Sequence, residues 1–513
     1  MAARLERAFE AERETWWTLG RALAGEPSAE FAHMPTAGTF GCDFGVMLAW
    51  CRLTRELGQE ASKTLVLCDD PWLFRQLATL PGVDAGKAPS MFPVTLRLAF
   101  RGWLARTKVA AKLAAATLQL RSTRRVMVAG DAVILVYGHP ASDTNGKDAY
   151  FGDLMKKFPG LKRLLHTDCD VRQARQLGAG NQTASLHAWG NPFFALSIIF
   201  SFWCPTGKHL SGATGWLVRR AQAMENSGGG VAMNRWQAHC QDRWMEAAKP
   251  GRVLWPWENH GWERNLCRAG RAKKIPLIGY QHTVIGPHQF NYATATNPDG
   301  LASIPDVVVA DGPAYRAEMI AWGVPEDRVV LGGAFRFPRF SGRLYDPTGP
   351  VFVPLSAVSA AATLQLEVAK KIAANGRAVV VKPHPMYPYD FQAQTNISRS
   401  DTSLADQNGL SAVLYSTGTS GLEARLMGIP AYRLMLEDSI AIDVLPAGYG
   451  ALAVTCESAA ESVIGGAAKP EQIAWDDILC DPDWEVWKTL LSGDIDTAPG
   501  NSAPSSNETK QAS

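Results

Sequence analysis

The stretch that decides the fold reads AVVVKPHP (378–385) and then, after a polar interval, SAVLYSTGTSGLEARLMGIPAYRL (411–434). Each half opens with a short apolar run rich in β-branched residues, which is typical of a buried parallel strand. Each run then stops in polar residues mixed with Gly and Pro. The pattern predicts two strand–loop–helix units of an α/β fold.

A helix is predicted to begin directly after the second apolar run. Ser420 and Glu423 have the spacing of a capping box, in which their side chains accept hydrogen bonds from exposed backbone N–H groups. Gly428 and Pro430 form a normal stop signal for that helix. The second unit is therefore a strand, a Ser/Thr-rich turn and a short helix.

Polar residues follow the carboxyl ends of both predicted strands, and they are Lys382, His384, Ser416, Thr417 and Ser420. Open α/β sheets bind ligands at this edge, and a helix N-terminus there offers N–H groups and positive potential to a phosphate. The alternative is two ordinary connections in which Ser420 and Glu423 only cap a helix. Because both halves occur together and in this order, we favour an anion-binding site.

A Lys-Pro-His-Pro strand end, a Ser/Thr-rich turn with a following Glu, and Gly-Ile-Pro together resemble the donor-binding domain of bacterial GT-B glycosyltransferases. The resemblance is to enzymes of capsule and lipopolysaccharide assembly, including Kdo, sialic acid and polysialic acid transferases and related glycerophosphotransferases. It covers residues 250–435 with motifs. It implies an α/β protein of the GT-B class, with two Rossmann-like domains facing each other across a cleft.

In those families the histidine and the Ser/Thr turn hold the nucleotide phosphate of a CMP-linked donor. The resemblance therefore implies a donor site at the second-domain strand ends. Its residues would be Lys382, His384, Pro385, Ser416, Thr417, Thr419, Ser420 and Glu423.

Composition narrows the class of protein. A chain of 513 residues, 46% hydrophobic and 19% charged, fits a folded protein of two or three domains, and a net charge of +2 does not favour a nucleic-acid binder. The nine cysteines include no Cys-x-x-Cys pair, which argues against a disulfide framework and a zinc site. The opening MAARLERAFEAERE predicts a charged helix rather than a signal peptide. We expect a cytoplasmic protein with no metal and no nucleic-acid partner.

Alternating strand and helix patterns suggest the domain boundaries. The predicted parts are an acceptor-side Rossmann-like domain (1–340), a linker (341–350), a nucleotide-sugar-binding Rossmann-like domain (351–480), a C-terminal helix (481–492) and a disordered tail (493–513). Near the N-terminus, a Gly-rich turn (38–45) carries Asp43, which we expect to cap a helix or to face the cleft. LVLCDD (65–70) predicts the first buried strand.

The stretch from 85 to 130 contains no Asp or Glu and nine Lys or Arg. On a helix, Arg97, Arg101, Lys108 and Lys112 fall on one narrow stripe. A basic amphipathic helix over 97–125 is suited to peripheral contact with the anionic surface of the inner membrane. The alternative is the solvated face of a helix that packs inward.

A second chemical cluster lies in RVLWPWENHGWERNL (252–266) and KIPLIGYQHTVIGPHQF (274–290). Two adjacent predicted strand ends present Glu258 and His282 at one edge of a sheet, and the following helix carries Glu263. Glycosyl transfer needs a base for the acceptor hydroxyl, or a carboxylate nucleophile. We predict Glu258, His282 and Glu263 as catalytic candidates. Alternatively, Glu258 caps the helix and His282 is a structural histidine.

The resemblance and the residues together predict a metal-independent GT-B glycosyltransferase without a cofactor. Its co-substrate would be a nucleotide sugar, CMP-activated and carrying a 2-keto sugar acid such as Kdo or a nonulosonate. Its acceptor would be a surface glycan, a lipid-linked glycan or a protein. Two alternatives stay open: a nucleotide-sugar epimerase of the same fold, and a non-catalytic scaffold of a polysaccharide assembly complex.

Overall fold

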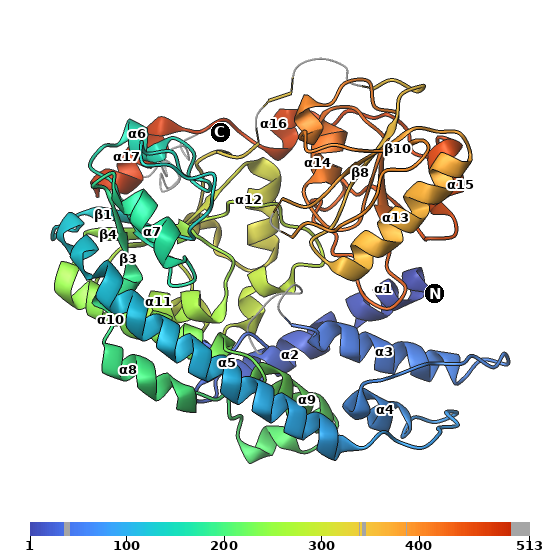
Figure 1. Ribbon diagram of the computed structural model, residues 1–513, viewed down its shortest axis with the longest axis horizontal. Helices are drawn as coiled ribbons and strands as arrows, with labels where there is room; N and C mark the ends of the chain where they lie inside the picture. The colour runs from blue at the N-terminus through green and yellow to red at the C-terminus, as the bar shows by residue number, and fades with distance from the viewer. Residues whose placement is uncertain (35–41, 338, 341–344, 386, 494–513) are drawn as a thin grey trace, which may run out of the picture.

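The computed structural model describes most of the chain, in the ranges 1–34, 42–337, 339–340, 345–385 and 387–493 (Figure 1). Three sequence predictions fall wholly or partly outside these described residues. They concern the Gly-rich turn up to residue 41, the first part of the linker (341–344) and the tail from residue 494.

The first domain is built on a seven-stranded parallel sheet of order β3-β2-β1-β4-β5-β6-β7. Its strands are β1 (Ala132–Val136), β2 (Lys162–Leu165), β3 (Thr183–Ser185), β4 (Arg252–Pro256), β5 (Leu277–Tyr280), β6 (Val307–Ala310) and β7 (Val329–Leu331). Successive residues of β1 point to opposite faces of the sheet. Val133 and Leu135 belong to one hydrophobic core, and Ile134 and Val136 belong to another. Helices therefore cover both faces of the sheet.

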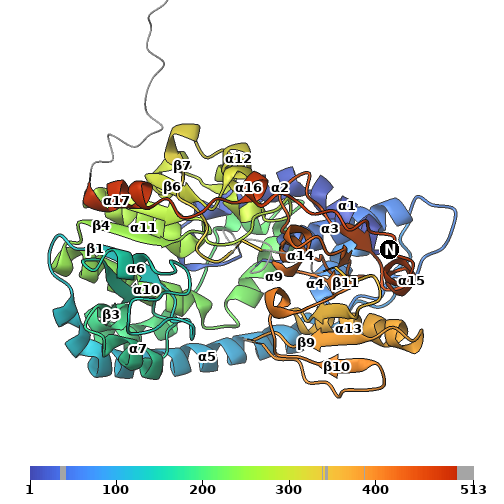
Figure 2. The same cartoon turned by 90° about the horizontal axis from the view of Figure 1, so that it is seen from above.

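Helix α5 of this domain precedes β1, and the other helices lie between its strands in the sequence. They are α5 (Met91–Leu120), α6 (Leu154–Lys157), α7 (Val171–Gly178), α8 (Pro192–Ser197), α9 (Gly215–Glu225), α10 (Gly230–Ala248), α11 (Gly261–Ala272) and α12 (Pro313–Ala321). The longest, α5, runs along the outside of the domain in both views (Figures 1 and 2).

The second domain has a six-stranded parallel sheet of order β10-β9-β8-β11-β12-β13, the order typical of a Rossmann fold. Its strands are β8 (Val351–Pro354), β9 (Val379–Lys382), β10 (Ile397–Arg399), β11 (Ala412–Tyr415), β12 (Ala431–Leu434) and β13 (Leu452–Val454). Its helices are α13 (Ser359–Ala374), α14 (Ser420–Leu426), α15 (Ala459–Ile464) and α16 (Trp475–Ile478). Two Rossmann-like domains in one chain confirm the predicted GT-B class.

Both ends of the chain connect the two domains (Figure 1). The first helices are α1 (Ala2–Ala11), α2 (Arg13–Ala24), α3 (Phe44–Leu57) and α4 (Pro71–Leu77), and α1 contacts the second domain through Glu6 and Arg433. The last helix, α17 (Trp484–Ser492), packs on the first domain, where the indole N–H of Trp487 donates to the Gly332 carbonyl at 2.8 Å.

The predicted strand at Leu65–Asp70 is wrong. This segment joins neither sheet, and Leu65 and Leu67 are 84% and 87% exposed. The apolar run has no neighbouring strand to pair with, and its last residue begins a helix instead. Asp70 accepts hydrogen bonds from the backbone N–H groups of Trp72 and Leu73 at the start of α4. Asp70 and Asp43 also hold the buried Arg220 of α9 in ion pairs.

Candidate functional site

The first domain gathers acid–base side chains where β4 and β5 end. Glu258 and His260 follow β4, and His282 follows β5, which pairs with β4 in parallel. A Glu258 carboxylate oxygen lies 2.8 Å from Nε2 of His260, and the other oxygen lies 3.6 Å from Nε2 of His282. The structure thus brings the two predicted residues together and adds a second histidine.

The ionisation of this cluster is set by burial and by mutual charge. Burial acts to raise the pKa of Glu258, but the hydrogen bond with His260 and the nearby charges of His260, His282 and Arg336 lower it to about 2. Burial opposes the charge of His260, yet Glu258 outweighs burial and the pKa of His260 is raised. Burial lowers the pKa of His282 to about 4. At neutral pH, Glu258 is a carboxylate and His282 is neutral.

Glu263 lies behind this cluster rather than in it. Its carboxylate is fully buried in the first turn of α11 and accepts hydrogen bonds from the backbone N–H groups of Glu258 and Asn259 at 2.9 and 2.8 Å. These bonds hold a turn in which Asn259 has a φ of 58°. Burial raises the pKa of Glu263 to about 7. Its position is that of a residue that fixes the Glu258 loop.

A second histidine–carboxylate pair follows β2. Nδ1 of His166 lies 3.2 Å from Asp168 Oδ1, and His166 Nε2 is buried without a hydrogen-bond partner among the described residues. The Tyr137 ring, after β1, lies 4.8 Å from the His166 ring and 5.9 Å from Tyr150. Tyr150 in turn lies 5.1 Å from the His282 ring. Aromatic rings thus connect the two pairs along one sheet edge.

The second domain has a pocket of about 490 Å³ at the ends of β8, β9 and β11. Seven of the eight residues predicted to bind the donor line it, namely Lys382, His384, Pro385, Thr417, Thr419, Ser420 and Glu423. They come from two strand ends and from the turn into α14. The structure therefore places the two motif halves around one cavity.

Two cations in this pocket have no carboxylate partner among the described residues. Lys382 and Arg336 both line the cavity, and neither forms an ion pair with any part of the chain that the structure describes. Arg336 also donates to the His282 carbonyl at 3.4 Å, so it lies between the pocket and the first-domain cluster. Unpaired cations at a cavity wall favour a bound anion.

The Ser/Thr turn divides into structural and pocket-facing residues. Ser416 is buried, and its hydroxyl donates to the Leu434 carbonyl at 3.1 Å, so it does not line the pocket. Thr417 accepts a hydrogen bond from the Ile442 backbone N–H. The predicted capping box of Ser420 and Glu423 is wrong. The N-cap of α14 is Thr419, and its hydroxyl donates to the Glu423 carboxylate at 2.8 Å.

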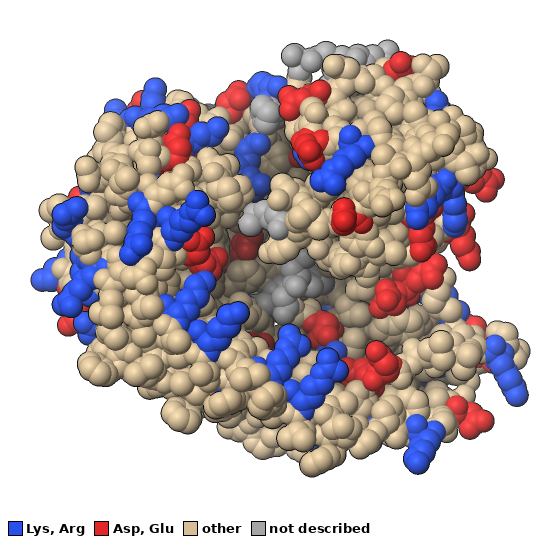
Figure 3. Space-filling view, viewed as in Figure 1, with Lys and Arg blue, Asp and Glu red and all other residues tan. Residues whose placement is uncertain are grey.

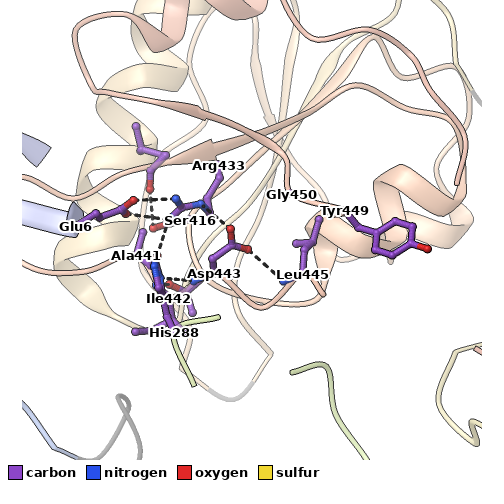
Figure 4. Close-up of polar contacts among 12 residues, drawn as sticks. Glu6, His288, Ser416, Arg433, Ala441, Ile442, Asp443, Leu445, Tyr449 and Gly450 are labelled. Carbon is purple, nitrogen blue, oxygen red and sulfur yellow. Dashed lines mark hydrogen bonds and ion pairs between the residues drawn. The ribbon is translucent and has the colours of Figure 1, made fainter. Parts of the chain in front are cut away.

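A polar network beneath the turn links it to the N-terminal helix (Figure 4). Both terminal nitrogens of Arg433 in β12 contact Glu6 of α1 at 2.8 Å, and all of these groups are buried. Arg433 also donates to the Ala441 carbonyl and faces Asp443 at 3.6 Å. Nδ1 of His288, from the first domain, accepts from the Asp443 backbone N–H at 3.0 Å. The Ser/Thr turn of the second domain therefore rests on contacts that cross between domains.

No protein-family model matches the chain, and no curated protein is similar to it in sequence. The solved structures that resemble it include the kitacinnamycin glycotransferase (11% identity, TM-score 0.38), which aligns over 65% of this chain and 91% of its own. SnogD, a glycosyltransferase from Streptomyces nogalater, aligns at 13% identity and TM-score 0.35, over 66% and 91%.

A UDP-N-acetylglucosamine 2-epimerase from Rickettsia bellii aligns at 14% identity and TM-score 0.33, over 66% of this chain and 88% of its own. Likenesses of this extent assign neither a reaction nor a substrate to the present chain.

Sequence reasoning missed Arg336, His260 as a partner of Glu258, and the His166–Asp168 pair. The signal for the last two was present, because each group follows an apolar strand and the ends of parallel strands share one edge. Arg336 carries no such signal. It lies beyond β7, in a segment whose path between the domains sequence periodicity does not indicate.

Proposed function

We propose that this protein is a glycosyltransferase that moves a sugar from a nucleotide-activated donor to a hydroxyl group of an acceptor. One observation carries the proposal: the unpaired cations Lys382 and Arg336 line a pocket that adjoins the Glu258–His260–His282 cluster. Cations suit the phosphate of the donor and of the leaving nucleotide, and the cluster suits the proton of the acceptor.

In this mechanism the second domain holds the donor. Lys382, His384 and the pocket-facing part of the Ser/Thr turn bind the phosphate, and Arg336 stabilises the negative charge that grows on it as the glycosidic bond breaks. These groups would supply the charge that a divalent metal supplies in other transferases, so we propose a metal-independent reaction. The donor class follows the resemblance of the Lys-Pro-His-Pro motif: a CMP-linked 2-keto sugar acid.

The first domain then holds the acceptor and removes its proton. Glu258 is a carboxylate that reaches the partly exposed side of the cluster, and His260 has a raised pKa and can retain the proton. Glu263 positions this loop through two backbone hydrogen bonds. Tyr137 and Tyr150 offer ring faces beside hydrogen-bonding groups, which suits a glycan, lipid-linked or protein-attached acceptor. We propose a cytoplasmic setting, because all nine cysteines are unpaired thiols.

A nucleotide-sugar epimerase is the second candidate, and a specific observation favours it. The His166–Asp168 and Glu258–His260 pairs provide two separate acid–base groups at one sheet edge. Epimerisation takes a proton from one face of a sugar and returns it on the other, which calls for two such groups.

The deciding experiment is to incubate the protein with a panel of CMP-, UDP- and GDP-linked sugars, with and without glycan acceptors. A transferase releases free nucleotide, and release accelerates with acceptor. An epimerase converts the nucleotide sugar into its epimer without acceptor. Binding of nucleotide with neither product would identify the scaffold alternative.

A further inference from the structure

The long helix α5 carries an exposed surface that the proposed reaction does not use. It is a helix of 30 residues, about 45 Å in length, on the outside of the first domain (Figures 1 and 2). Only one narrow side of it is buried, by residues that include Gly102, Arg106 and Leu113. Most of the remaining residues of the helix are exposed.

Large apolar side chains occupy part of this exposed surface. Phe92 is 73% exposed, Phe100 61% and Trp103 52%, and Leu96 and Leu104 are exposed beside them. At about 100° per residue, these five side chains cover one continuous third of the helix surface. Side chains of this size are rarely left together in water unless they meet a partner.

The basic residues predicted from sequence form the adjoining stripe. Arg97, Arg101, Lys108 and Lys112 are all exposed, and none of them forms an ion pair within the part of the chain that the structure describes. In the space-filling view, a row of Lys and Arg follows the diagonal that α5 takes in Figure 1 (Figure 3). Two of the nine basic residues of this stretch are held by hydrogen bonds within the protein. Arg106 donates to the Ile199 and Asn226 carbonyls, and Arg124 donates to the Ala188 carbonyl.

A second exposed apolar element lies alongside α5. Helix α8 and the 3-10 helix η4 (Ile198–Phe200) pack against it, and Phe193 and Phe200 are 82% and 75% exposed. The Arg106 guanidinium lies 4.2 Å from the centre of the Phe202 ring and fixes this element to α5. The surface is therefore two helical segments wide, with aromatic rings on both segments.

We infer that α5 with α8 and η4 forms a docking surface for an anionic lipid bilayer. Exposed aromatic rings enter the boundary between headgroups and acyl chains, and the adjacent unpaired Lys and Arg face the acidic headgroups. The lack of any Asp or Glu from 85 to 130 removes repulsion along the whole helix. No helix among the described residues is long and apolar enough to span a membrane, so this contact is interfacial.

The test is co-sedimentation of the full chain with vesicles of phosphatidylglycerol and phosphatidylcholine, compared with phosphatidylcholine alone. Binding is expected to be much stronger to the anionic vesicles than to phosphatidylcholine alone. It should weaken when ionic strength rises from about 0.01 M to about 1 M, which shortens the Debye length from about 30 Å to about 3 Å. The quadruple variant Arg97→Gln/Arg101→Gln/Lys108→Gln/Lys112→Gln should lose at least about tenfold in partitioning at low salt.

A matched control removes four exposed lysines elsewhere, as Lys273→Gln/Lys370→Gln/Lys469→Gln/Lys488→Gln, and should bind vesicles like the unchanged protein. The double variant Phe100→Ser/Trp103→Ser should lose the part of binding that survives high salt. Equal binding by the quadruple variant and its control would overturn the inference. So would binding to soluble dextran sulfate without binding to vesicles, because the surface would then recognise a polyanion rather than a lipid. The inference does not depend on the proposed reaction, since every readout is lipid binding.

Discussion

The two Rossmann-like domains place polar residues at the same edge of their sheets, yet these residues are satisfied in different ways. In the first domain, Glu258 is already paired with His260 and lies near His282. In the second domain, Lys382 has no ion-pair partner among the described residues, and the pocket around it is open. A carboxylate–histidine pair is suited to proton transfer. An unpaired cation in a cavity is suited to binding an anionic ligand. Changes in the two domains should therefore affect different steps.

The largest effect is expected from Glu258→Gln. The substitution keeps the shape of the side chain but removes the charge that holds His260, so turnover should fall by roughly 10²–10⁴-fold, the usual contribution of a general base. Donor affinity should change little, because Lys382, His384 and the Ser/Thr turn lie in the other domain. Steady-state kinetics and calorimetry measure the two quantities, with Glu246→Gln on the surface of α10 as control. Near-normal turnover would show that the base lies elsewhere.

Lys382→Met should weaken binding of the nucleotide. Loss of one charge-assisted phosphate contact costs about 1.5–3 kcal/mol, so the Kd for the nucleotide should rise roughly 10–150-fold. His384→Ala should weaken binding by about tenfold or more for the same reason. Calorimetry with CMP, CDP and UDP is the measurement, and Lys370→Met, an exposed lysine of α13, is the matched control. Unaltered affinity for all three nucleotides would move the donor site away from this pocket.

The stability of the protein should depend on pH through His282, which belongs to the first-domain cluster. The pKa of His282 is lowered by burial to about 4, from an ordinary 6.5, so the folded protein binds its proton less readily than the unfolded chain. His282 therefore contributes stability that is fully present above pH 6.5 and is lost as pH falls toward 4, up to about 3 kcal/mol. In His282→Gln the melting temperature should depend less on pH across this window. An equal slope in both proteins would contradict the pKa shift.

The smallest effect is expected from a chelator. If Lys382 and Arg336 supply the charge that stabilises the leaving nucleotide, EDTA should leave turnover unchanged, and added Mg²⁺ or Mn²⁺ should not raise it. The measurement is nucleotide release before and after dialysis against EDTA. Loss of activity that a metal restores would overturn the metal-independent mechanism.

Sequence patterns predicted central strands of both sheets, because buried parallel strands such as Leu277–Tyr280 and Ala412–Tyr415 are continuous apolar runs. The edge strands β3, β10 and β13 were not predicted. Each has three residues, too few for a periodic signal, and is defined by its neighbour rather than by its own sequence. The false strand at Leu65–Asp70 shows the converse: a strong apolar run is no strand where no partner strand exists.

The sheet topology also explains which residues of the candidate site could be predicted from the sequence. Residues at the end of a strand or just beyond it, such as Lys382 and Glu258, are positioned by the sheet, so their neighbourhood can be inferred from topology. Ser416 also follows a strand, but its side chain turns inward to the Leu434 carbonyl, which depends on a residue in the next strand. Arg336 reaches the pocket from a connecting segment, and only the folded chain shows that path.

The contact between Glu6 and Arg433 has a consequence for synthesis of the chain. The two residues are 427 positions apart, so at roughly 5–20 residues per second the ribosome makes Arg433 roughly 20–85 s after Glu6. During this interval α1 can pack its apolar side on α3, but the carboxylate has no guanidinium to meet. Glu6 of α1 therefore gains its buried ion-pair partner only after all seven strands of the first sheet and the first four strands of the second sheet have been synthesised.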